Sequence, residues 1–379
     1  MKVSISVAGK FQAYDLAREL NRRECLGQLI TSLPKFTTKG YVPREKVDSV
    51  VLPEALIRAW RKLPSFMRNA YDPHARISAM YDGMASRALR KCDICVAWAG
   101  YGLETLRRAK KLGAKTVIER GSSHILYHTE ILKEEAALQH SRVQFGHPKV
   151  IEKELREYEE ADYISIPSLF VKRTFLDRGF PESKLIHVPY GVDLALFKEV
   201  RKEDGVFRVI FGGGICFRKG VHYLLQAFAE LNLPNSELLL LGTVADEMIP
   251  YLKKYEGHFR QMAYRPKSEL HWWYSQGSVF VMPSLEEGLA MVQPQAMACG
   301  LPVVATTNTG GDDIIRDGID GYIIPIRDVE KLKEKILFLY KHPEERKAMG
   351  RSAKERVQAG FTWSDYGDKM VEEYGKIIA

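Results

Sequence analysis

Short apolar runs alternate with longer amphipathic stretches along the whole chain. The runs are rich in Val, Ile, Leu and Phe, and Gly, Pro or Ser often follows them, as is typical of buried parallel strands. The stretches between them have the periodicity of helices, so strand and helix alternate throughout. The predicted strands are residues 3–8, 26–30, 93–99, 116–119, 161–168, 207–211, 237–242, 262–264, 278–282, 302–306 and 323–326.

Both halves of the chain contain such a series. A length of 379 residues suffices for two domains with separate cores. We therefore predict an α/β protein with two doubly wound, Rossmann-like parallel-sheet domains that face one another across a cleft.

One stretch of the second half has the features of a ligand site. The strand 278–282 leads into a predicted helix at 290–299, and the next strand is followed by Gly310, Gly311 and a predicted helix start at Asp312. Both loops leave the carboxyl ends of neighbouring parallel strands. Open parallel sheets bind ligands at that edge, and backbone N–H groups at helix N-termini favour anions.

The same stretch resembles a known signature. Pro283-Ser-x-x-Glu287-Gly288, then Gln295 and the run Ala296–Thr306, resemble the donor-binding signature of GT-B glycosyltransferases of family 4. In that family two glutamates separated by seven residues contact the donor sugar and the nucleotide ribose. Glu287 matches the first glutamate, and Gln295 stands in place of the second. Eight helical residues span ~12 Å, about the reach from a hexose across a diphosphate to a ribose.

Gln295 can still hydrogen-bond a hydroxyl, but it carries no charge. From the residues alone, a solvated loop carboxylate is the alternative for Glu287, and a polar residue on an exposed helix face is the alternative for Gln295. The resemblance also implies donor contacts from neighbouring loop residues, namely Gly288, Leu289, Ala290, Met291, Gly310 and Gly311.

A second loop has the composition of a phosphate site. Gly213 and Gly214 follow a strand, and Arg218 and Lys219 precede a helix. Glycines let a backbone approach a ligand closely, and a lysine neutralises phosphate as a compact point charge. In the resembling family an early arginine and this lysine hold the donor diphosphate. Lys219 matches the lysine, whereas the arginine position falls on Gly214. Arg218 is the candidate replacement, with solvated helix-start charges as the alternative.

The resemblance supplies further candidates in other loops. Gly9 and Lys10 would lie on the acceptor side of the cleft. His124 would contact the donor sugar near the reacting centre, with His128 as the fallback, and Arg265 lies where the family binds the nucleotide base. Taken alone, a loop histidine or lysine is most often a solvated surface residue.

The resemblance also divides the chain. Residues 185–193 match the strand and hinge that end the family's first domain, which puts the linker near residues 190–203. We expect an acceptor-side domain at 1–190, a nucleotide-sugar-binding domain at 191–361, and a terminal helix at 362–379 that packs back on the first domain.

Charge is distributed unevenly along the chain. The formal net charge is +8, but residues 1–190 carry a balance of +10 and the remainder a balance of −2. A basic half indicates an anionic partner, such as a phospholipid surface, a lipid-linked diphosphate or an acidic polysaccharide. Nucleic acid is not expected, because no recognised nucleic-acid module accompanies the charge. Residues 34–91 interleave Lys and Arg with aromatics (Phe66, Arg68 and Tyr71 among them), which suits a bilayer interface. Solvated faces of core-packing helices are the alternative.

Neither the cysteines nor the N-terminus indicates export. Five cysteines are an odd number, and Cys92 and Cys95 run into an apolar strand, so we interpret them as small buried residues. The first apolar run is too short for a secretory signal, and no run of about eighteen apolar residues occurs. We expect a cytoplasmic protein, peripheral on the inner face of a membrane if the basic half binds lipid.

These features predict a glycosyltransferase that moves a hexose from a nucleotide-sugar to a glycan, lipid-linked or polysaccharide acceptor. Retention of configuration is implied only by the resemblance. Lys219, Arg218 and loop amides would stabilise charge on the departing diphosphate without a metal or cofactor, and Glu287 and His124 would act at the sugar. A sugar-nucleotide epimerase of the same fold and a non-catalytic binder of sugar nucleotides or membranes are the alternatives.

Overall fold

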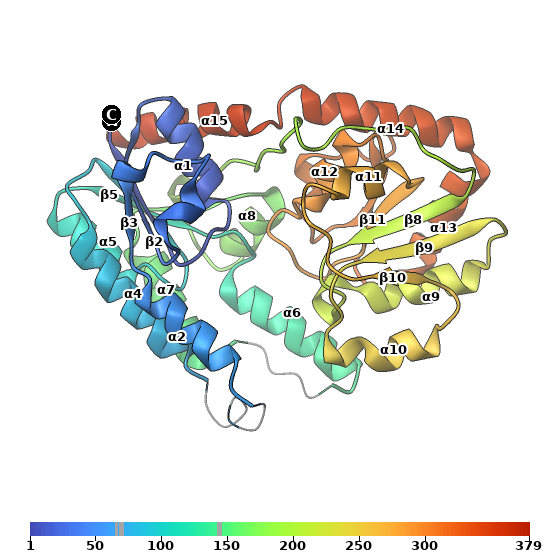
Figure 1. The fold of residues 1–379 in the computed structure, drawn as a ribbon, viewed down its shortest axis with the longest axis horizontal. Coiled ribbons are helices and arrows are strands. Elements are labelled where there is room, and N and C mark those ends of the chain that lie inside the picture. Colours follow the sequence, from blue (N-terminus) through green and yellow to red (C-terminus); the bar gives the residue numbers. More distant parts are fainter. Residues whose placement is uncertain (65–66, 68–71, 142–145) are drawn as a thin grey trace.

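The computed structural model describes residues 1–64, 67, 72–141 and 146–379. Its two lobes each contain one sheet (Figure 1). Within the described residues the strand orders are β3-β2-β1-β4-β5-β6-β7 and β10-β9-β8-β11-β12-β13, and neighbouring strands are parallel. The predicted fold class, two doubly wound α/β domains, is therefore confirmed.

The elements follow the predicted alternation of strand and helix. The strands of the first lobe are β1 (Val3–Val7), β2 (Leu26–Thr31), β3 (Val47–Ser49), β4 (Ile94–Trp98), β5 (Lys115–Glu119), β6 (Tyr163–Ile166) and β7 (Leu185–His187). Those of the second lobe are β8 (Phe207–Gly212), β9 (Ser236–Leu241), β10 (Arg260–Met262), β11 (Val279–Met282), β12 (Val303–Thr306) and β13 (Gly321–Ile324). The helices are α1 (Ala13–Arg22), α2 (Leu52–Arg61), α4 (His74–Ala88), α5 (Leu103–Lys111), α6 (Ile125–Leu138), α7 (Pro148–Glu160), α8 (Leu169–Leu176), α9 (Val221–Leu231), α10 (Ile249–Lys254), α11 (Leu270–Ser275), α12 (Val292–Ala298), α13 (Val329–Lys341), α14 (Pro343–Gln358) and α15 (Trp363–Ile378).

The central strands β1 and β8 are buried along their whole length. Helices cover both faces of each sheet, so both faces of these strands are buried. β8 is apolar except for Arg208, whereas in β1 the buried Ser4 and Ser6 alternate with Val and Ile. In the first lobe α1 packs against α15, and α5 packs against α4 and α7. In the second lobe α9 packs against α13 and α12 against α14.

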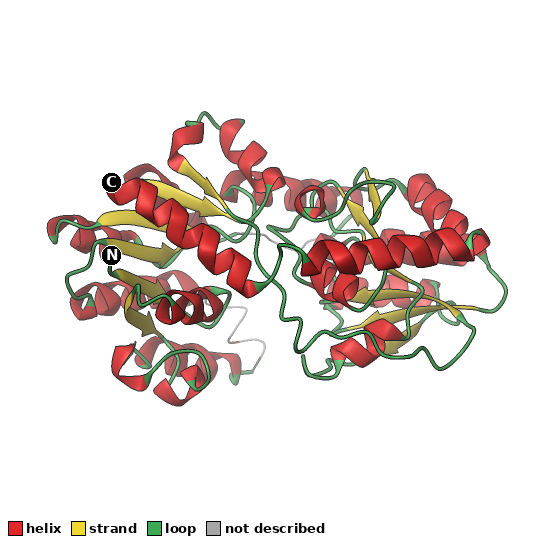
Figure 2. Ribbon diagram, turned by 90° about the horizontal axis from the view of Figure 1, so that it is seen from above, coloured by secondary structure: helices red, strands yellow, loops and turns green. Residues whose placement is uncertain are grey.

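The two chain crossings between the lobes lie side by side. Val192, in the first crossing, forms an isolated parallel bridge with Thr362 in the second. A capping box of Thr362 and Asp365 then starts α15. This helix packs on the first lobe, where Arg23 Nη2 lies 2.8 Å from a carboxylate oxygen of Asp368. Both chain ends are on that lobe (Figure 2).

The prediction that a helix starts at Asp312 is wrong. The chain makes only the single turn η6 (Gly311–Asp313). Both acidic side chains instead bind the first lobe, since Asp312 pairs with Arg173 and Asp313 accepts a hydrogen bond from the Leu169 N–H, each at 2.8 Å. The edge strand β3 was not predicted, and β10 begins two residues earlier than expected.

Cys92 and Cys95 are buried, and all five cysteines are free thiols. The interpretation of this pair as small buried residues is therefore confirmed. None of the helices in the described ranges is long and apolar enough to cross a lipid bilayer.

Candidate active site

Three predicted site residues, Arg218, Lys219 and Glu287, form one ion cluster between the loops that follow β8 and β11. Arg218 Nη1 lies 2.9 Å from Glu287 Oε1, and Lys219 Nζ contacts the same oxygen. Ser284 Oγ donates to that carboxylate at 3.2 Å. Burial opposes the charged form of Glu287, but Lys219 and Arg218 outweigh it and hold its pKa below the usual value. Glu287 is therefore a buried, ionised carboxylate rather than a solvated one.

Close backbone packing fixes the cationic turn against the Glu287 loop. Gly220 ends the turn η4 (Phe217–Lys219) with a φ of 63°, and a Cβ there would lie 2.0 Å from the Pro283 carbonyl oxygen. Only glycine fits such an approach. The positions of the two cations are thus set by the backbone as well as by their ion pairs.

The two glycines after β8 have different surroundings. At Gly213 φ is 141°, and a Cβ would lie 3.7 Å from Lys219 Cε. At Gly214 φ is outside the left-handed region, and no described atom lies within 4 Å of where a Cβ would be. A side chain at Gly214 would therefore have open space in the loop where the resembling family carries arginine.

Glu286, which the sequence analysis did not single out, joins the two lobes. It is fully buried. Its Oε1 accepts hydrogen bonds from the Ser123 N–H at 2.9 Å and from the Ser122 and Ser123 hydroxyls at 2.5 and 2.7 Å. Its Oε2 lies 2.9 Å from His128 Nδ1. Burial opposes ionisation, but His128, Arg218 and Ser122 outweigh it and hold the pKa of Glu286 well below its usual range. The only sequence signal for this residue is its position beside the matched glutamate.

The two lobes touch at Gly288. A Cβ at this position would lie 2.0 Å from the Gly121 carbonyl oxygen in the first lobe, and Ser168 Oγ donates to the Gly288 carbonyl at 2.6 Å. Gly310 has a φ of 70°, and its Cβ would lie 2.7 Å from the same carbonyl. Both glycines are thus required by the close approach of three loops.

The structure does not bring His124 to the ion cluster. Its ring is 1% exposed and packs against Tyr158, Phe175 and Phe180. Its Nδ1 accepts a hydrogen bond from the Leu126 N–H at 3.3 Å, so His124 caps α6. Burial, together with nearby cations, lowers the pKa of His124 to about 4. The fallback His128, one turn further on, contacts Glu286 instead.

The rest of the predicted donor-binding stretch is largely buried. Leu289 and Ala290 are buried, Met291 is half-buried, and the Ala290 N–H donates to the Thr309 carbonyl at 3.0 Å. Gln295, on α12, is 7% exposed and so does not lie on an exposed helix face. A contact between Gln295 and a ribose remains a prediction.

Two other predicted cations lie over aromatic rings. Lys10 Nζ is 4.5 Å from the centre of the Tyr41 ring, and the Arg265 guanidinium is 5.5 Å from that of Trp273. Gly9, before the lysine, has a φ of 131°. Within the described part of the chain, neither cation contacts the ion cluster.

A further buried carboxylate binds α6 to the second lobe. Glu135 lies 2.8 Å from His222 Nε2 and accepts hydrogen bonds from the Tyr223 hydroxyl at 2.8 Å and from Arg327 Nε at 2.7 Å. Burial opposes its ionisation, but these hydrogen bonds lower its pKa to about 2. The buried carboxylates thus pair with protein groups. Among the described residues no group of three His, Cys, Asp or Glu could hold a metal ion.

Comparisons with known proteins fit this geometry. Residues 193–356 match the model of the family described as Glycosyl transferases group 1. The GDP-mannose-dependent alpha-(1-6)-phosphatidylinositol monomannoside mannosyltransferase of Mycolicibacterium smegmatis is 26% identical over 241 residues, which cover 56% of this chain and 62% of that protein. The D-inositol 3-phosphate glycosyltransferase of Arthrobacter sp. (strain FB24) is 31% identical over 205 residues, which cover 49% and 48%. The chain spans about half to two thirds of the length of the curated relatives it matches.

Solved structures resemble the whole chain. Sucrose-phosphate synthase from Thermosynechococcus elongatus has a TM-score of 0.71 at 18% identity, over 100% of this chain and 99% of that one. HepE from Anabaena, in complex with UDP-glucose, has a TM-score of 0.70 at 14% identity, over 99% and 100%. The fold is therefore GT-B. Within its second lobe, residues 193–356 match the model of the Glycosyl transferases group 1 family.

Proposed function

We propose that this protein is a metal-independent hexosyltransferase that uses a nucleotide-sugar donor and retains the configuration of the transferred sugar. The observation that carries the proposal is the buried ion cluster, in which Glu287 forms ion pairs with both Arg218 and Lys219. The cluster lies at the carboxyl ends of the strands of the second sheet. The family match of that lobe supports it. So do the relatives that are named as glycosyltransferases.

The donor diphosphate would replace Glu287 as the partner of Arg218 and Lys219. The two cations would then stabilise the negative charge that develops on the leaving diphosphate. Glu287, freed from its ion pairs, would accept hydrogen bonds from hydroxyls of the donor sugar. The N–H groups of Gly288 and Leu289 make no hydrogen bond within the described residues and would be further donors. Gln295 would bind the ribose.

His128 replaces His124 as the histidine we assign to the reacting centre. It is 26% exposed and lies against Glu286, in the first turn of α6, which follows the loop that meets Gly288. A neutral or protonated imidazole there can donate a hydrogen bond toward the sugar. Arg265 remains our candidate for the nucleotide base. The nucleotide base differs among the similar proteins, since the mannosyltransferase relative is GDP-mannose-dependent and the HepE structures contain UDP and UDP-glucose.

The acceptor would bind a cavity of about 160 Å³ in the first lobe, beside the predicted acceptor loop. Ala8 and Phe11 from that loop line it, with Ser32, Tyr81 and Tyr101. Ser32 is buried, and its hydroxyl has no hydrogen-bond partner among the described residues. An aromatic-walled cavity with one free hydroxyl suits a sugar ring of a glycan, a polysaccharide or a lipid-linked acceptor.

We propose that the basic half of the chain, residues 1–190, binds the cytoplasmic face of a membrane. Around α2 the apolar side chains of Val51, Leu52 and Leu56 are 44%, 49% and 40% exposed, beside Arg58 and Lys62. Exposed apolar residues next to cations suit an anionic bilayer. From the same stretch, three predicted contacts lie outside the described residues: Phe66, Arg68 and Tyr71. Adsorption to anionic vesicles that falls with salt would support this docking, and equal adsorption to neutral vesicles would contradict its electrostatic part.

The proposed activity is tested by nucleoside-diphosphate release from UDP-glucose and from GDP-mannose, with and without a glycolipid extract as acceptor. A transferase releases it faster when the acceptor is present, and Glu287→Gln should abolish that stimulation. The matched control is Glu345→Gln, an exposed glutamate on α14. Conversion of the donor to another sugar nucleotide without acceptor would instead identify an epimerase. Equal signals for wild type and Glu287→Gln would identify a non-catalytic binder.

A further inference from the structure

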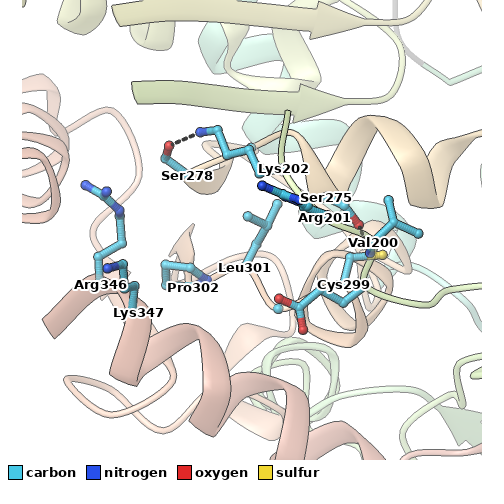
Figure 3. Close-up of a pocket in the computed structure, with 13 residues that line it drawn as sticks. Val200, Arg201, Lys202, Ser275, Ser278, Cys299, Leu301, Pro302, Arg346 and Lys347 are labelled. Carbon is cyan, nitrogen blue, oxygen red and sulfur yellow. Dashed lines mark hydrogen bonds between the residues drawn. The ribbon is translucent and has the colours of Figure 1, made fainter. Parts of the chain in front are cut away.

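A cavity of about 480 Å³ lies in the second lobe, between the linker and α14 (Figure 3). Its floor is formed by Leu301 and Pro302, directly before β12, and by Ser278, directly before β11. The ion cluster follows the carboxyl ends of β8 and β11. Since the strands are parallel, the cavity lies at the amino ends of the strands and the ion cluster lies at their carboxyl ends.

Four cations surround this cavity. Arg201 and Lys202 come from the linker between the lobes, and Arg346 and Lys347 come from α14 (Figure 3). Among the described residues Glu199 is the one carboxylate that lines it, and it already pairs with Lys354 at 2.9 Å. Lys347 pairs with Glu344, also at 2.9 Å. The lining of the cavity therefore carries an excess of positive charge, which comes from Arg201, Lys202 and Arg346.

The two half-buried cations have only neutral partners. Lys202 Nζ donates to the Val206 carbonyl at 2.6 Å and to Ser278 Oγ at 2.8 Å, which leaves one N–H of the ammonium unused. Arg346 Nη1 donates to the Leu339 carbonyl at 2.6 Å. Among the described residues neither side chain forms a salt bridge.

Burial and repulsion both act against these charges. Burial, with Arg208 and Arg346 nearby, lowers the pKa of Lys202 to about 8, and burial lowers the pKa of Arg346. A half-buried cation without a counter-ion is costly, and a bound anion would relieve both the desolvation and the repulsion.

We propose that this cavity binds the phosphate of a phosphorylated small molecule, with Lys202, Arg201 and Arg346 on the phosphate and Leu301 and Pro302 against the organic part. The guanidinium of Arg346 can bind two phosphate oxygens at once, and Lys202 offers its unused N–H as a point charge. The volume exceeds that of a phosphate alone, which leaves room for a sugar or a similar group.

The position of the cavity gives the ligand a regulatory role. The linker forms one crossing between the lobes, and α14 leads into the other. A second cavity, of about 600 Å³, continues along α14 and shares Glu199, Gly300 and Lys347 with the first. A ligand that ties the linker to α14 would therefore hold the two lobes in one arrangement. This regulatory role rests on the proposed transferase function, whereas the binding itself does not.

The test is calorimetric titration with pyrophosphate, using a background of Arg218→Gln and Lys219→Gln so that the ion cluster does not contribute. Saturable binding of one pyrophosphate is expected, weakened at least tenfold by Lys202→Gln with Arg346→Gln. Arg201→Gln, whose side chain is exposed, should weaken binding without any effect on folding. The exposed Lys341→Gln, outside the cavity, is the control and should bind as before.

Absence of saturable binding in that background would overturn the proposal, and so would unchanged binding in Arg201→Gln. Because no donor or acceptor enters the titration, a failure here leaves the proposed transferase activity untouched. Conversely, pyrophosphate binding at the linker would stand even if UDP-glucose and GDP-mannose were both inactive as donors.

Discussion

The Oε1 atom of Glu286 and the backbone nitrogen of Ser123 lie 2.9 Å apart across the boundary between the lobes. The carboxylate stays ionised in a fully buried place because Ser122, Ser123 and His128 surround it. The neighbouring residue in sequence, Glu287, points to Arg218 and Lys219 instead. The two adjacent glutamates therefore have different roles. Glu286 joins the lobes, and Glu287 pairs with the cations that we propose bind the donor.

Glu286→Gln should destabilise the protein. The amide keeps the size of the side chain but loses charge-assisted hydrogen bonds, which contribute about 1.5–3 kcal/mol each. We expect the apparent unfolding midpoint to fall by roughly 2–6 °C. Differential scanning calorimetry measures this, with the exposed Glu345→Gln as control. A midpoint equal to that of the control would contradict the bridging role.

Much of the fold could be predicted from sequence because its signals are local. Within the predicted runs 207–211 and 278–282, residues 209–211 and 279–282 are apolar on both faces, as is typical of strands covered by helices on both sides. Lys219 and Glu287 could be found because the loops that contain them resemble the donor-binding loops of family 4 GT-B glycosyltransferases.

The missed features depend on contacts between distant segments. Nothing near Glu286 in the sequence indicates that Ser123 will lie against it. The ring of His124 is buried because Phe175 and Phe180, about fifty residues away, pack around it. The single turn at Asp312 likewise ends early because its carboxylates bind the other lobe.

Substitutions of Lys219 and Glu287 in the ion cluster should have opposite effects on the binding of a nucleoside diphosphate. Lys219→Gln should weaken the binding of the free nucleoside diphosphate by roughly 10- to 150-fold, as expected for a lost charge-assisted contact of about 1.5–3 kcal/mol. Glu287→Gln should bind the same diphosphate at least as tightly as wild type, because the carboxylate no longer competes for the cations. Isothermal titration with UDP and GDP measures both. Weaker binding in Glu287→Gln would refute the competition.

Gly214→Arg should strengthen donor binding. The position has open space and an ordinary φ, so an arginine can be added without strain and supply a further cation to the diphosphate. We expect roughly tenfold tighter binding of the nucleoside diphosphate. Gly213→Arg is the matched control, because its φ of 141° makes the same substitution strained and destabilising. Equal behaviour of the two variants would show that the loop is arranged differently.

The two histidines should respond differently to substitution. His124→Phe should lower stability by about 1 kcal/mol through loss of the helix cap, but it should keep kcat within roughly twofold because its ring lies among aromatic side chains. His128→Gln should lower kcat, since we assign that residue to the reacting centre. Steady-state kinetics and thermal melts of both variants measure this. A large loss of kcat in His124→Phe would return the catalytic role to His124.

Because Glu135 is ionised in its ion pairs, the free energy of unfolding should decrease as the pH becomes acidic. Its folded pKa of about 2 lies below the unfolded value of about 4.3. Its stabilisation, about 3 kcal/mol by linkage, is therefore complete at neutral pH and is lost as the pH falls from about 5 toward 2. The difference in midpoint between wild type and Glu135→Gln should be largest at pH 7 and should shrink by more than half at pH 3. A difference that stays constant with pH would contradict an ionised Glu135.

The proposed function requires that a sugar nucleotide binds at Arg218, Lys219 and Glu287. The most direct measurement is a thermal-shift panel of UDP, GDP, ADP and their common sugar conjugates, on wild type and on Lys219→Gln in parallel, since a ligand that binds only the folded state raises its apparent stability. We predict that one nucleotide class raises the midpoint of the wild type and has little effect on Lys219→Gln. An equal shift in both proteins, or no shift with any nucleotide, would contradict binding at this cluster.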